Sequence, residues 1–252
     1  MNPKGLSLDF ILDQKIKNKL KNIIYSFENA ANRSYPFNSI FLNPYEIRII
    51  TSYLDKQGFR FFLHGGDENS ERKVVSTEDS PICSVLVFKI NVGKNEINHR
   101  DILGSLISLG MDRDWIGDII LYDDFSEIAI LNEKESLIRS IDRIRNFEIF
   151  PEIYTWPKFT FLNKNYTEIS GFVTSLRLDN FISLITKLSR SKANSVIKSG
   201  SVKVNFIEEN SSSKLIEPGD EISIRGIGRF VFKELLGKSK SDRLRVKILK
   251  RE

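Results

Sequence analysis

One stretch, residues 177–229, constrains the fold of this chain more than any other, because its apolar residues change period along its length. Between residues 178 and 188, apolar side chains recur three and four positions apart, which predicts an amphipathic helix. A shorter stripe over 193–197 predicts a second helix after a polar break. Ser189 and Ser191 are both candidates for the N-cap of that helix. Two consecutive short helices are therefore expected.

The second half of the same stretch alternates as β-strands do. Gly200 stands where the C-cap glycine of the second helix belongs. Apolar and polar residues then alternate in 202–204 and again in 222–224, and the Pro-Gly-Asp sequence at 218–220 predicts a turn between them. The stretch is therefore expected to place two short helices against a small sheet, with basic residues on its open side.

Charge is distributed unevenly over the 252 residues, whose net charge is +5. Residues 177–252 contain 17 Lys and Arg against 9 Asp and Glu, a balance of +8, whereas residues 1–176 contain 21 against 24, a balance of −3. A basic segment on a mildly acidic body is the pattern expected when one end of a protein contacts nucleic acid. A solvated basic face without a ligand is the alternative explanation.

The composition excludes several classes of protein. Hydrophobic residues make up 40% and charged residues 28% of the chain, as in ordinary globular proteins. No apolar run reaches the ~18 residues of a membrane span, and the first residues lack the apolar core and cleavage site of a secretory signal. The single cysteine, Cys83, excludes an intramolecular disulfide, and two histidines exclude a His-rich metal site. We therefore expect a cytoplasmic protein with no membrane attachment, cofactor, metal or small-molecule substrate.

The first 165 residues indicate a helical region followed by a mixed one. Apolar stripes predict helices over 8–33 and 45–57, and an aromatic-rich run predicts a strand over 59–63. The later elements follow the order strand, helix, strand, strand, helix, strand, which is the split βαβ order of ferredoxin-like folds. They are expected at 82–90, 102–109, 116–122, 127–131, 133–145 and 147–154.

This ferredoxin-like order is shared by RNA-recognition motifs and many enzymes, so it does not by itself indicate a function. An RNA-recognition motif carries paired aromatic residues on its central strands, but only Phe88 and Tyr122 are aromatic on these strands. Contacts with an RNA backbone or with protein are therefore favoured over base stacking.

The remaining segments predict a connector and a basic hairpin. Residues 158–162 are expected to be extended, and the alternation in 230–248 predicts a hairpin from which Lys247, Lys250 and Arg251 could reach RNA or guard the edge of the sheet. The predicted fold class is α+β. Its domains are a mainly helical N-terminal domain (1–75), a ferredoxin-like, RRM-like βαββαβ middle domain (76–165) and a small α+β domain that ends in the basic hairpin (170–252).

The basic domain resembles a known RNA-binding module. The motifs RLD, SRSKA, IKSGSVKVN and EPGDEISIRG occur in order within residues 177–226 and resemble the S-four RNA-binding domain, whose helix pair and following strand form a platform for structured RNA. The planar guanidinium of arginine, the ammonium of lysine and the N–H groups at a helix N-terminus all bind phosphate favourably. The residues expected at the RNA are Arg177, Ser189, Arg190, Lys192, Lys198, Lys203, Asn205, Arg225 and Arg229.

Nearly the whole chain is similar to YlmH-family proteins, which are bacterial RNA-binding proteins often encoded beside cell-division genes. The similarity rests on FLNPYE at 41–46, GGDENSERK at 65–73, HRDILGSLISLGMDRDWIGDIIL at 99–121 and FVFKELLGKSKSDRLRV at 230–246. It implies binding to ribosomal RNA and tRNA on the large ribosomal subunit, in the rescue of stalled translation. Secondary contacts are expected from Arg72, Lys73, Arg100 and Arg113.

Catalysis has little support in the sequence. A methyltransferase needs a glycine-rich cofactor loop, and Gly65-Gly66 lacks the spacing of a nucleotide fingerprint. His64 is expected at the surface without a partner motif, and Cys83 is expected to be buried and inert. We therefore predict a non-catalytic RNA-binding protein of translation or ribosome-associated quality control. The alternatives are a protein-interaction factor of the division machinery and, less favoured, an RNA-modifying enzyme.

Overall fold

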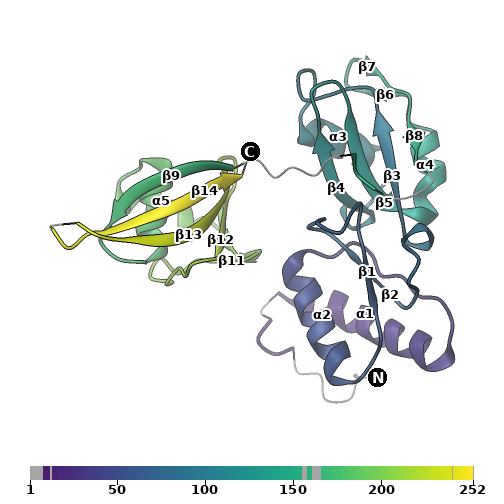
Figure 1. The fold of residues 1–252 in the computed structure, drawn as a ribbon, viewed down its shortest axis with the longest axis horizontal. Helices are drawn as coiled ribbons and strands as arrows, with labels where there is room; N and C mark the ends of the chain where they lie inside the picture. The colour runs from purple at the N-terminus through teal and green to yellow at the C-terminus, as the bar shows by residue number, and fades with distance from the viewer. Residues whose placement is uncertain (1–7, 12, 155–157, 161–165, 240, 252) are drawn as a thin grey trace. The chain divides into compact units, whose positions relative to one another are not determined.

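The structure is a computed structural model that describes residues 8–11, 13–154, 158–160, 166–239 and 241–251. The chain forms two compact units, residues 1–162 and 163–252 (Figure 1). Each unit combines helices and antiparallel strands, so the predicted α+β class is confirmed. The further division of the first unit near residue 75 stays a prediction.

The N-terminal region of unit 1 contains two capped helices and a short hairpin. Its elements are α1 (Gln14–Arg33), α2 (Pro44–Lys56), β1 (Phe62–His64) and β2 (Val74–Ser76). The first helix begins at residue 14 rather than at residue 8, because the Asp13 carboxylate accepts the backbone N–H groups of Lys15 and Ile16 at 2.8 and 3.2 Å and caps it there. A reciprocal capping box between Asn43 and Glu46 starts the second helix.

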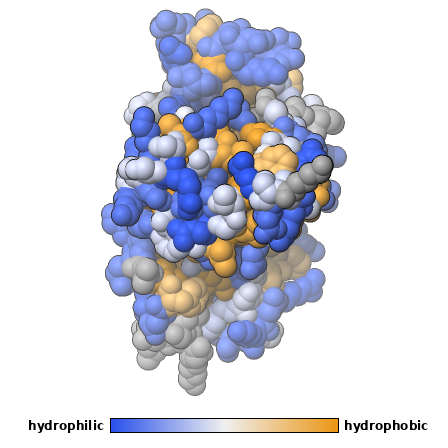
Figure 2. Space-filling model, turned by 90° about the vertical axis from the view of Figure 1, so that its left-hand side faces the viewer, coloured by the Kyte–Doolittle hydropathy of each residue, from blue (hydrophilic) through white to orange (hydrophobic). Residues whose placement is uncertain are grey.

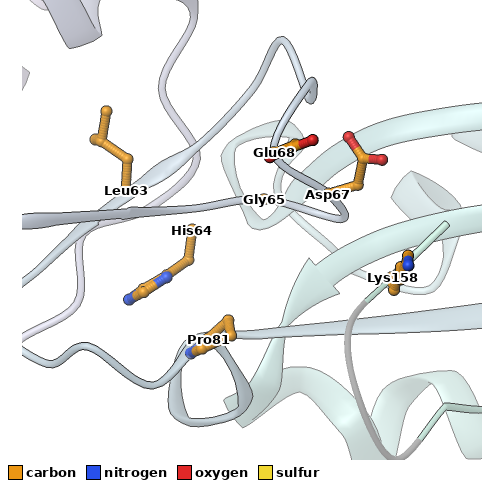
Figure 3. Close-up of a pocket in the computed structure, with 7 residues that line it drawn as sticks. All are labelled: Leu63, His64, Gly65, Asp67, Glu68, Pro81 and Lys158. Atoms are coloured by element: carbon orange, nitrogen blue, oxygen red, sulfur yellow. The ribbon is translucent and has the colours of Figure 1, made fainter.

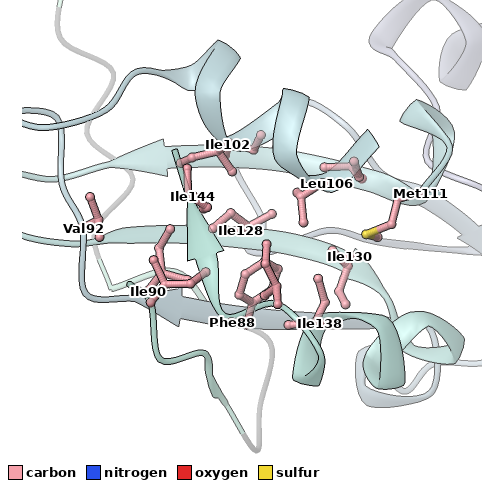
Figure 4. Close-up of a cluster of buried hydrophobic side chains, with 14 of the residues drawn as sticks. Phe88, Ile90, Val92, Ile102, Leu106, Met111, Ile128, Ile130, Ile138 and Ile144 are labelled. Atoms are coloured by element: carbon pink, nitrogen blue, oxygen red, sulfur yellow. The ribbon is translucent and has the colours of Figure 1, made fainter. Parts of the chain in front are cut away.

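The middle region of unit 1 has the predicted ferredoxin-like order. Its main elements are β3 (Val85–Ile90), α3 (His99–Ser108), β4 (Ile116–Leu121), β5 (Ser126–Leu131), α4 (Glu135–Arg139) and β8 (Glu152–Ile153), with short 3₁₀ turns at Pro81–Cys83, Arg113–Trp115 and Asn132–Lys134. The strands pair antiparallel in the order β4-β5-β3-β8. On one face, Phe88, Ile128 and Ile130 of the sheet point toward Ile102 and Leu106 of α3 (Figure 4).

Several predictions about this region were wrong. The helix expected over 133–145 ends at residue 139, and a two-stranded hairpin, β6 (Arg143–Ile144) and β7 (Phe147–Glu148), follows it. The apolar residues that suggested a longer helix, Ile141 and Ile144, are buried by this hairpin instead. Cys83 is exposed, because it lies in a 3₁₀ turn before the strand. His64 is buried rather than at the surface.

Unit 2 packs two helices on one face of a six-stranded antiparallel sheet. Its elements are β9 (Tyr166–Val173), α5 (Leu178–Thr186), α6 (Arg190–Lys198), β10 (Val202–Val204), β11 (Ile207–Glu208), β12 (Glu221–Ile224), β13 (Gly228–Lys238) and β14 (Leu244–Arg251). The strand order is β11-β10-β12-β13-β14-β9. The expected helix pair, the strands after it and the C-terminal hairpin (yellow in Figure 1) are therefore confirmed.

The helix caps predicted in unit 2 are confirmed, but one strand of this unit was not predicted. Ser189 is the N-cap of α6, where its hydroxyl accepts the N–H of Lys192 at 3.4 Å, and Gly200 has φ +70° just after the helix. The strand β9 was not anticipated, and it pairs with β14 along its full length. The extended segment was expected at 158–162, of which residues 161–162 lie outside the described part of the chain.

Candidate nucleic-acid interface

Three of the family motifs meet in space inside unit 1. The Asp118 carboxylate on β4 accepts the backbone N–H groups of Glu71 and Arg72 at 2.6 and 3.2 Å. The N–H of Phe41 donates to the backbone carbonyl of Asp114 at 2.8 Å. Segments 41–46, 65–73 and 114–118, which we call the motif seam, are thereby joined although up to about 75 residues separate them. The motif seam holds the helical and the ferredoxin-like regions together.

An ion-pair network lies within the motif seam. The guanidinium of Arg72 contacts the Asp114 carboxylate at 3.2 Å and donates to the carbonyl of Phe41 at 3.1 Å, and its side chain is only 15% exposed. Lys19 of α1 contacts Asp114 at 2.8 Å and Glu46 at 2.9 Å. Removal of one partner from such a network would leave a largely buried charge without compensation, so the loss of any one of these side chains is expected to destabilise the fold.

The four residues expected as secondary RNA contacts therefore differ in whether their side chains already bond within the protein. Arg72 is engaged inside the motif seam, Lys73 donates to the carbonyl of Glu68 at 2.6 Å, and Arg113 donates to the carbonyl of Ile116 at 2.5 Å. Arg100 is exposed in the first turn of α3. The internal bonds give the first three a structural role, and the contact of any of the four with RNA stays a prediction.

The second face of the middle sheet, which an RNA-recognition motif would offer to bases, is covered here. Val85, Val87 and Ala129 point to this face and are completely buried. Phe41 from the motif seam and Phe159 from the connector, with 0% and 2% of their surfaces exposed, pack over them. Base stacking on this face of the sheet is therefore blocked by the protein itself.

Two motif glycines make room for these covering rings. A Cβ atom on Gly66 would lie 2.2 Å from the ring of Phe159, and one on Gly117 would lie 2.7 Å from the ring of Phe41. Only glycine permits such close approach. The φ angle of Gly117 is not positive, so what this position requires of glycine is space rather than a left-handed backbone.

A buried carboxylate fixes the connector beside the same sheet. Glu127 of β5 has no exposed surface and accepts hydrogen bonds from the hydroxyls of Tyr122 and Tyr154 at 2.8 and 2.6 Å. It also accepts the N–H of Thr160 at 2.8 Å, together with the hydroxyl of that residue. Burial and the bond to Glu127 raise the pKa of Tyr154. Tyr122, one of the two aromatics considered for base stacking, thus has its hydroxyl engaged internally.

A pocket of about 410 Å³ lies beside the glycine loop of unit 1 (Figure 3). Its lining residues are Leu63, His64, Gly65, Asp67, Glu68, Pro81 and Lys158. His64 Nε2 lies 2.7 Å from the carbonyl of Glu78, and Asp67 accepts the N–H of Asn69 at 2.6 Å within the turn. Within the described residues, no three His, Cys, Asp or Glu side chains are grouped to hold a metal ion. The hydrogen bonds of His64 and Asp67 are made within the protein and hold the loop in place.

In unit 2, the RLD and SRSKA motifs form an internal clamp. Asp179 is 1% exposed, and its carboxylate contacts Arg177 at 3.2 Å and Arg190 at 2.7 Å. Burial alone would raise the pKa of Asp179, but the hydrogen bonds and charges of the two arginines outweigh it and hold the pKa below its usual value. The clamp ties the start of α5 to the start of α6. It fixes the two guanidinium groups, whose side chains remain 38% and 54% exposed.

The structure separates the predicted RNA-contacting residues onto different surfaces. Lys192 and Lys198 are exposed on α6, the helix that begins at the clamp residue Arg190, and we call this set with Arg177 and Arg190 the helix face. Val202 and Val204 are buried and face the helices. Lys203 stands between them on the strand, so its side chain lies on the side of the sheet away from the helices. Arg229 shares that side.

Two further predicted contacts occupy turns. Arg225 is exposed in the turn after β12. Asn205, at φ +50°, donates its amide to Asp220 at 2.7 Å and accepts the N–H of Glu221 at 3.0 Å. Its side chain therefore closes a turn within the protein, and its role at RNA stays a prediction. Sequence patterns alone could not distinguish Asn205 from an RNA-facing amide, because both occur in polar turns.

Two protein families match separate parts of the chain. Residues 84–153 match the family described as "Putative RNA-binding domain in YlmH", and residues 176–222 match the "S4 domain". The "Ribosome-associated protein quality control protein P2" of Bacillus subtilis (strain 168) is 28% identical over 225 residues, which cover 82% of this chain and 84% of that protein. Among solved structures, "Cell division protein ylmH from Streptococcus pneumoniae" is 17% identical, with a TM-score of 0.49 over 60% of this chain and 94% of that chain.

These matches fall on the two regions that the sequence motifs singled out. The first spans the ferredoxin-like region between β3 and β8, and the second spans the clamp, the helix pair and the strands that follow. The chain thus contains a segment that matches the putative RNA-binding domain in YlmH, followed by a segment that matches the S4 domain, and its resemblance to the YlmH family is confirmed.

Proposed function

We propose that this protein is a non-catalytic RNA-binding protein that binds structured ribosomal RNA or tRNA with the helix face of its S-four domain. It acts on the large ribosomal subunit, in the cytoplasm, in translation or in ribosome-associated quality control. The two matched families support the RNA-binding part of this proposal. The name of the Bacillus subtilis relative supports the ribosome-associated part.

The observation that carries the proposal is the arrangement of cations on the helix face. Asp179 holds the guanidinium of Arg190 at the N-terminus of α6, and Lys192 and Lys198 are exposed on the same helix. A fixed guanidinium loses little freedom when it binds a phosphate, and its fork suits bidentate contact. The partial positive charge of the helix N-terminus acts in the same direction.

Co-sedimentation with ribosomal subunits at stepped salt concentrations tests this proposal. The structure selects Lys192→Glu/Lys198→Glu as the test variant, because both side chains are exposed and their replacement leaves the Asp179 clamp intact. Replacing Arg190 by Glu would instead place a second carboxylate beside buried Asp179 and destabilise the domain. We expect the wild type to travel with the large subunit at low salt and to be released steeply as salt rises. The variant is expected to remain at the top of the gradient.

The matched control is Lys15→Glu/Lys56→Glu, which makes the same change of net charge on exposed lysines of unit 1. It is expected to sediment as the wild type does. If the test variant still co-sediments with the large subunit, the helix face is not the anchor, and the alternative of a protein partner gains support. If the wild type ignores both subunits at every salt concentration, the ribosomal part of the proposal is wrong.

A further inference from the structure

The sheet of unit 2 has a second face that the helices do not cover. Residues that alternate with the core on neighbouring strands share this face, which we call the open sheet face. One row of directly paired residues crosses five strands in the order Lys203, Ser223, Arg229, Arg251 and Tyr166. Strands lie about 4.8 Å apart, so the row places Arg229 and Arg251 on adjacent strands, with Lys203 two strands away from Arg229, and it ends at an aromatic ring.

A second group of the same composition lies at the other end of β9. Phe172 is paired directly with Arg245 on β14. The guanidinium of Arg243 lies 6.0 Å from the centre of the Phe172 ring, and Arg243 donates to the carbonyl of Phe172 at 3.0 Å. Tyr166 and Phe172 are each 43% exposed, and because they are six residues apart on one strand their side chains are about 20 Å apart.

The region between the two groups is electrically mixed. Between the groups, Lys247 lies 3.6 Å from Glu168 and 3.4 Å from Glu234. Lys247 is therefore largely neutralised. Within the first group, Arg229 lies 3.9 Å from Glu221. The cations nearest the two aromatic rings are Arg251, paired with Tyr166, at one end and Arg243 and Arg245, beside Phe172, at the other. On the side of the molecule that Figure 2 shows, hydrophobic residues form small patches among hydrophilic ones.

We propose that the open sheet face is a second nucleic-acid surface, which binds a single-stranded segment of RNA along β9. Tyr166 and Phe172 stack on unpaired bases, and the cations beside them, with Arg251 and Arg245 nearest, contact the phosphates. The proposal extends the RNA-binding function above and rests on it. Most of the residues involved, on β9, β13 and β14, lie outside the matched S-four segment 176–222.

One physical argument favours single-stranded RNA over a duplex. Exposed aromatic rings on a sheet bind bases by stacking, which needs bases that are not already paired. The helix face has cations but no comparable pair of exposed aromatic rings on α5 or α6.

Fluorescence anisotropy with two labelled RNA probes tests this inference on the full-length protein. The probes are a twelve-nucleotide oligouridylate, which is single-stranded, and a stable RNA hairpin. The main variant is Phe172→Ala/Arg245→Ala, and Tyr166→Ala is a second variant at the other end of β9. The matched control, Lys214→Ala/Leu215→Ala, removes one cation and one exposed apolar side chain of unit 2 away from this face.

We expect the main variant to bind oligouridylate at least about tenfold more weakly, because one base stacked on an aromatic ring contributes about that much. Its hairpin affinity and that of the control should stay within about twofold of the wild type. Phe172→Ala alone should weaken oligouridylate binding without changing its salt dependence, whereas Arg245→Ala should lower the slope of log affinity against log salt by about 0.7. Circular dichroism verifies that each variant is folded.

The outcomes separate this inference from the proposed function. If the wild type binds the hairpin but not oligouridylate, or if all sheet variants bind oligouridylate as the wild type does, the open sheet face is not an RNA surface while the helix face remains supported. If the Lys192→Glu/Lys198→Glu variant loses the hairpin yet keeps oligouridylate, both surfaces bind RNA independently, as we propose. A wild type that binds neither probe contradicts both.

Discussion

The two large sheets of this protein are both antiparallel, yet they differ in what lies on their second face. In the sheet β4-β5-β3-β8 that face is buried beneath Phe41 and Phe159. In the sheet of unit 2 the corresponding face carries Arg245, Arg229 and exposed Phe172. An antiparallel sheet can be closed on both sides or open on one, and only the open one can offer side chains to a ligand. The ferredoxin-like order therefore does not make the middle sheet a base-stacking platform.

The sequences of the strands in the two sheets show the same difference between a covered and an open face. The middle strand β3 reads VLVFKI and has nearly continuous burial, as expected for a strand with two covered faces. The strand β14 reads LRVKILKR, in which buried Val246 and Ile248 alternate with more exposed basic residues. Any RNA contact of the middle domain must therefore come from its loops, helices or edges rather than from this buried face.

The largest expected effect is on the closed sheet. Phe159→Ala removes a ring that covers Val85 and Val87, and we expect the free energy of unfolding of unit 1 to fall by about 3–5 kcal/mol. Phe150→Ala, whose side chain is 63% exposed, should change it by less than about 0.5 kcal/mol. Urea unfolding followed by tryptophan fluorescence measures both. Equal effects of the two substitutions would show that Phe159 does not close the sheet.

A change in the clamp of unit 2 comes next. Asp179→Asn removes a buried carboxylate from two charged hydrogen bonds, and we expect a loss of about 1–3 kcal/mol in the stability of unit 2. The loss is smaller than for a fully buried pair because both arginines are partly exposed. Asp242→Asn, at an exposed ion pair with Lys238, should cost less than about 0.5 kcal/mol. Urea unfolding followed by circular dichroism is the measurement, and equal losses would contradict the clamp.

The close approach at Gly66 gives an effect of similar or smaller size that depends on its partner. Gly66→Ala should destabilise unit 1 by about 1–3 kcal/mol, because its Cβ would overlap the ring of Phe159. In the Phe159→Ala background the same change should cost little, which a double-mutant cycle measures as coupling. Gly104→Ala in α3, where nothing lies within 4 Å of the added Cβ, should instead stabilise the protein slightly. Additive effects at Gly66 and Phe159 would refute the contact.

The smallest expected effect is a dependence on pH. The folded-state pKa of Asp179 lies below its unfolded value, so the clamp contributes its full stability above about pH 4 and loses it as pH falls through the folded pKa. Unit 2 should therefore become less stable in acid. The pH dependence should be shallower in Asp179→Asn than in the wild type and unchanged in Asp242→Asn. Identical pH profiles for the wild type and Asp179→Asn would show that this carboxylate does not titrate as inferred.

Much of the fold could be predicted because its signals are local. Helix caps such as Ser189 and alternation such as that of β14 involve residues a few positions apart, whose geometry the backbone dictates. The missed strand β9 shows the limit of such signals. Its pattern is mostly polar, and it is a strand because β14 offers it a pairing edge.

The candidate site could be predicted only in part, for the same reason. The basic residues of the S-four motifs were found, but their assignment to one RNA-facing surface did not anticipate that Lys203 and Lys192 lie on opposite sides of the sheet. Nor could the sequence show that Arg72 is held by Asp114, since the two residues meet through packing. The sequence does not distinguish a cationic side chain that forms an internal ion pair from one that binds a phosphate.

The sequence by itself determined most of the helices and strands of this protein and their order, the basic character of its C-terminal part and its resemblance to RNA-binding families. Only the tertiary structure decided which faces remain accessible. Phe41 and Phe159 close one sheet because two distant segments fold over it where Gly117 and Gly66 leave room. Local periodicity specifies which residues share a face, whereas the occupant of that face depends on contacts between segments far apart in the chain.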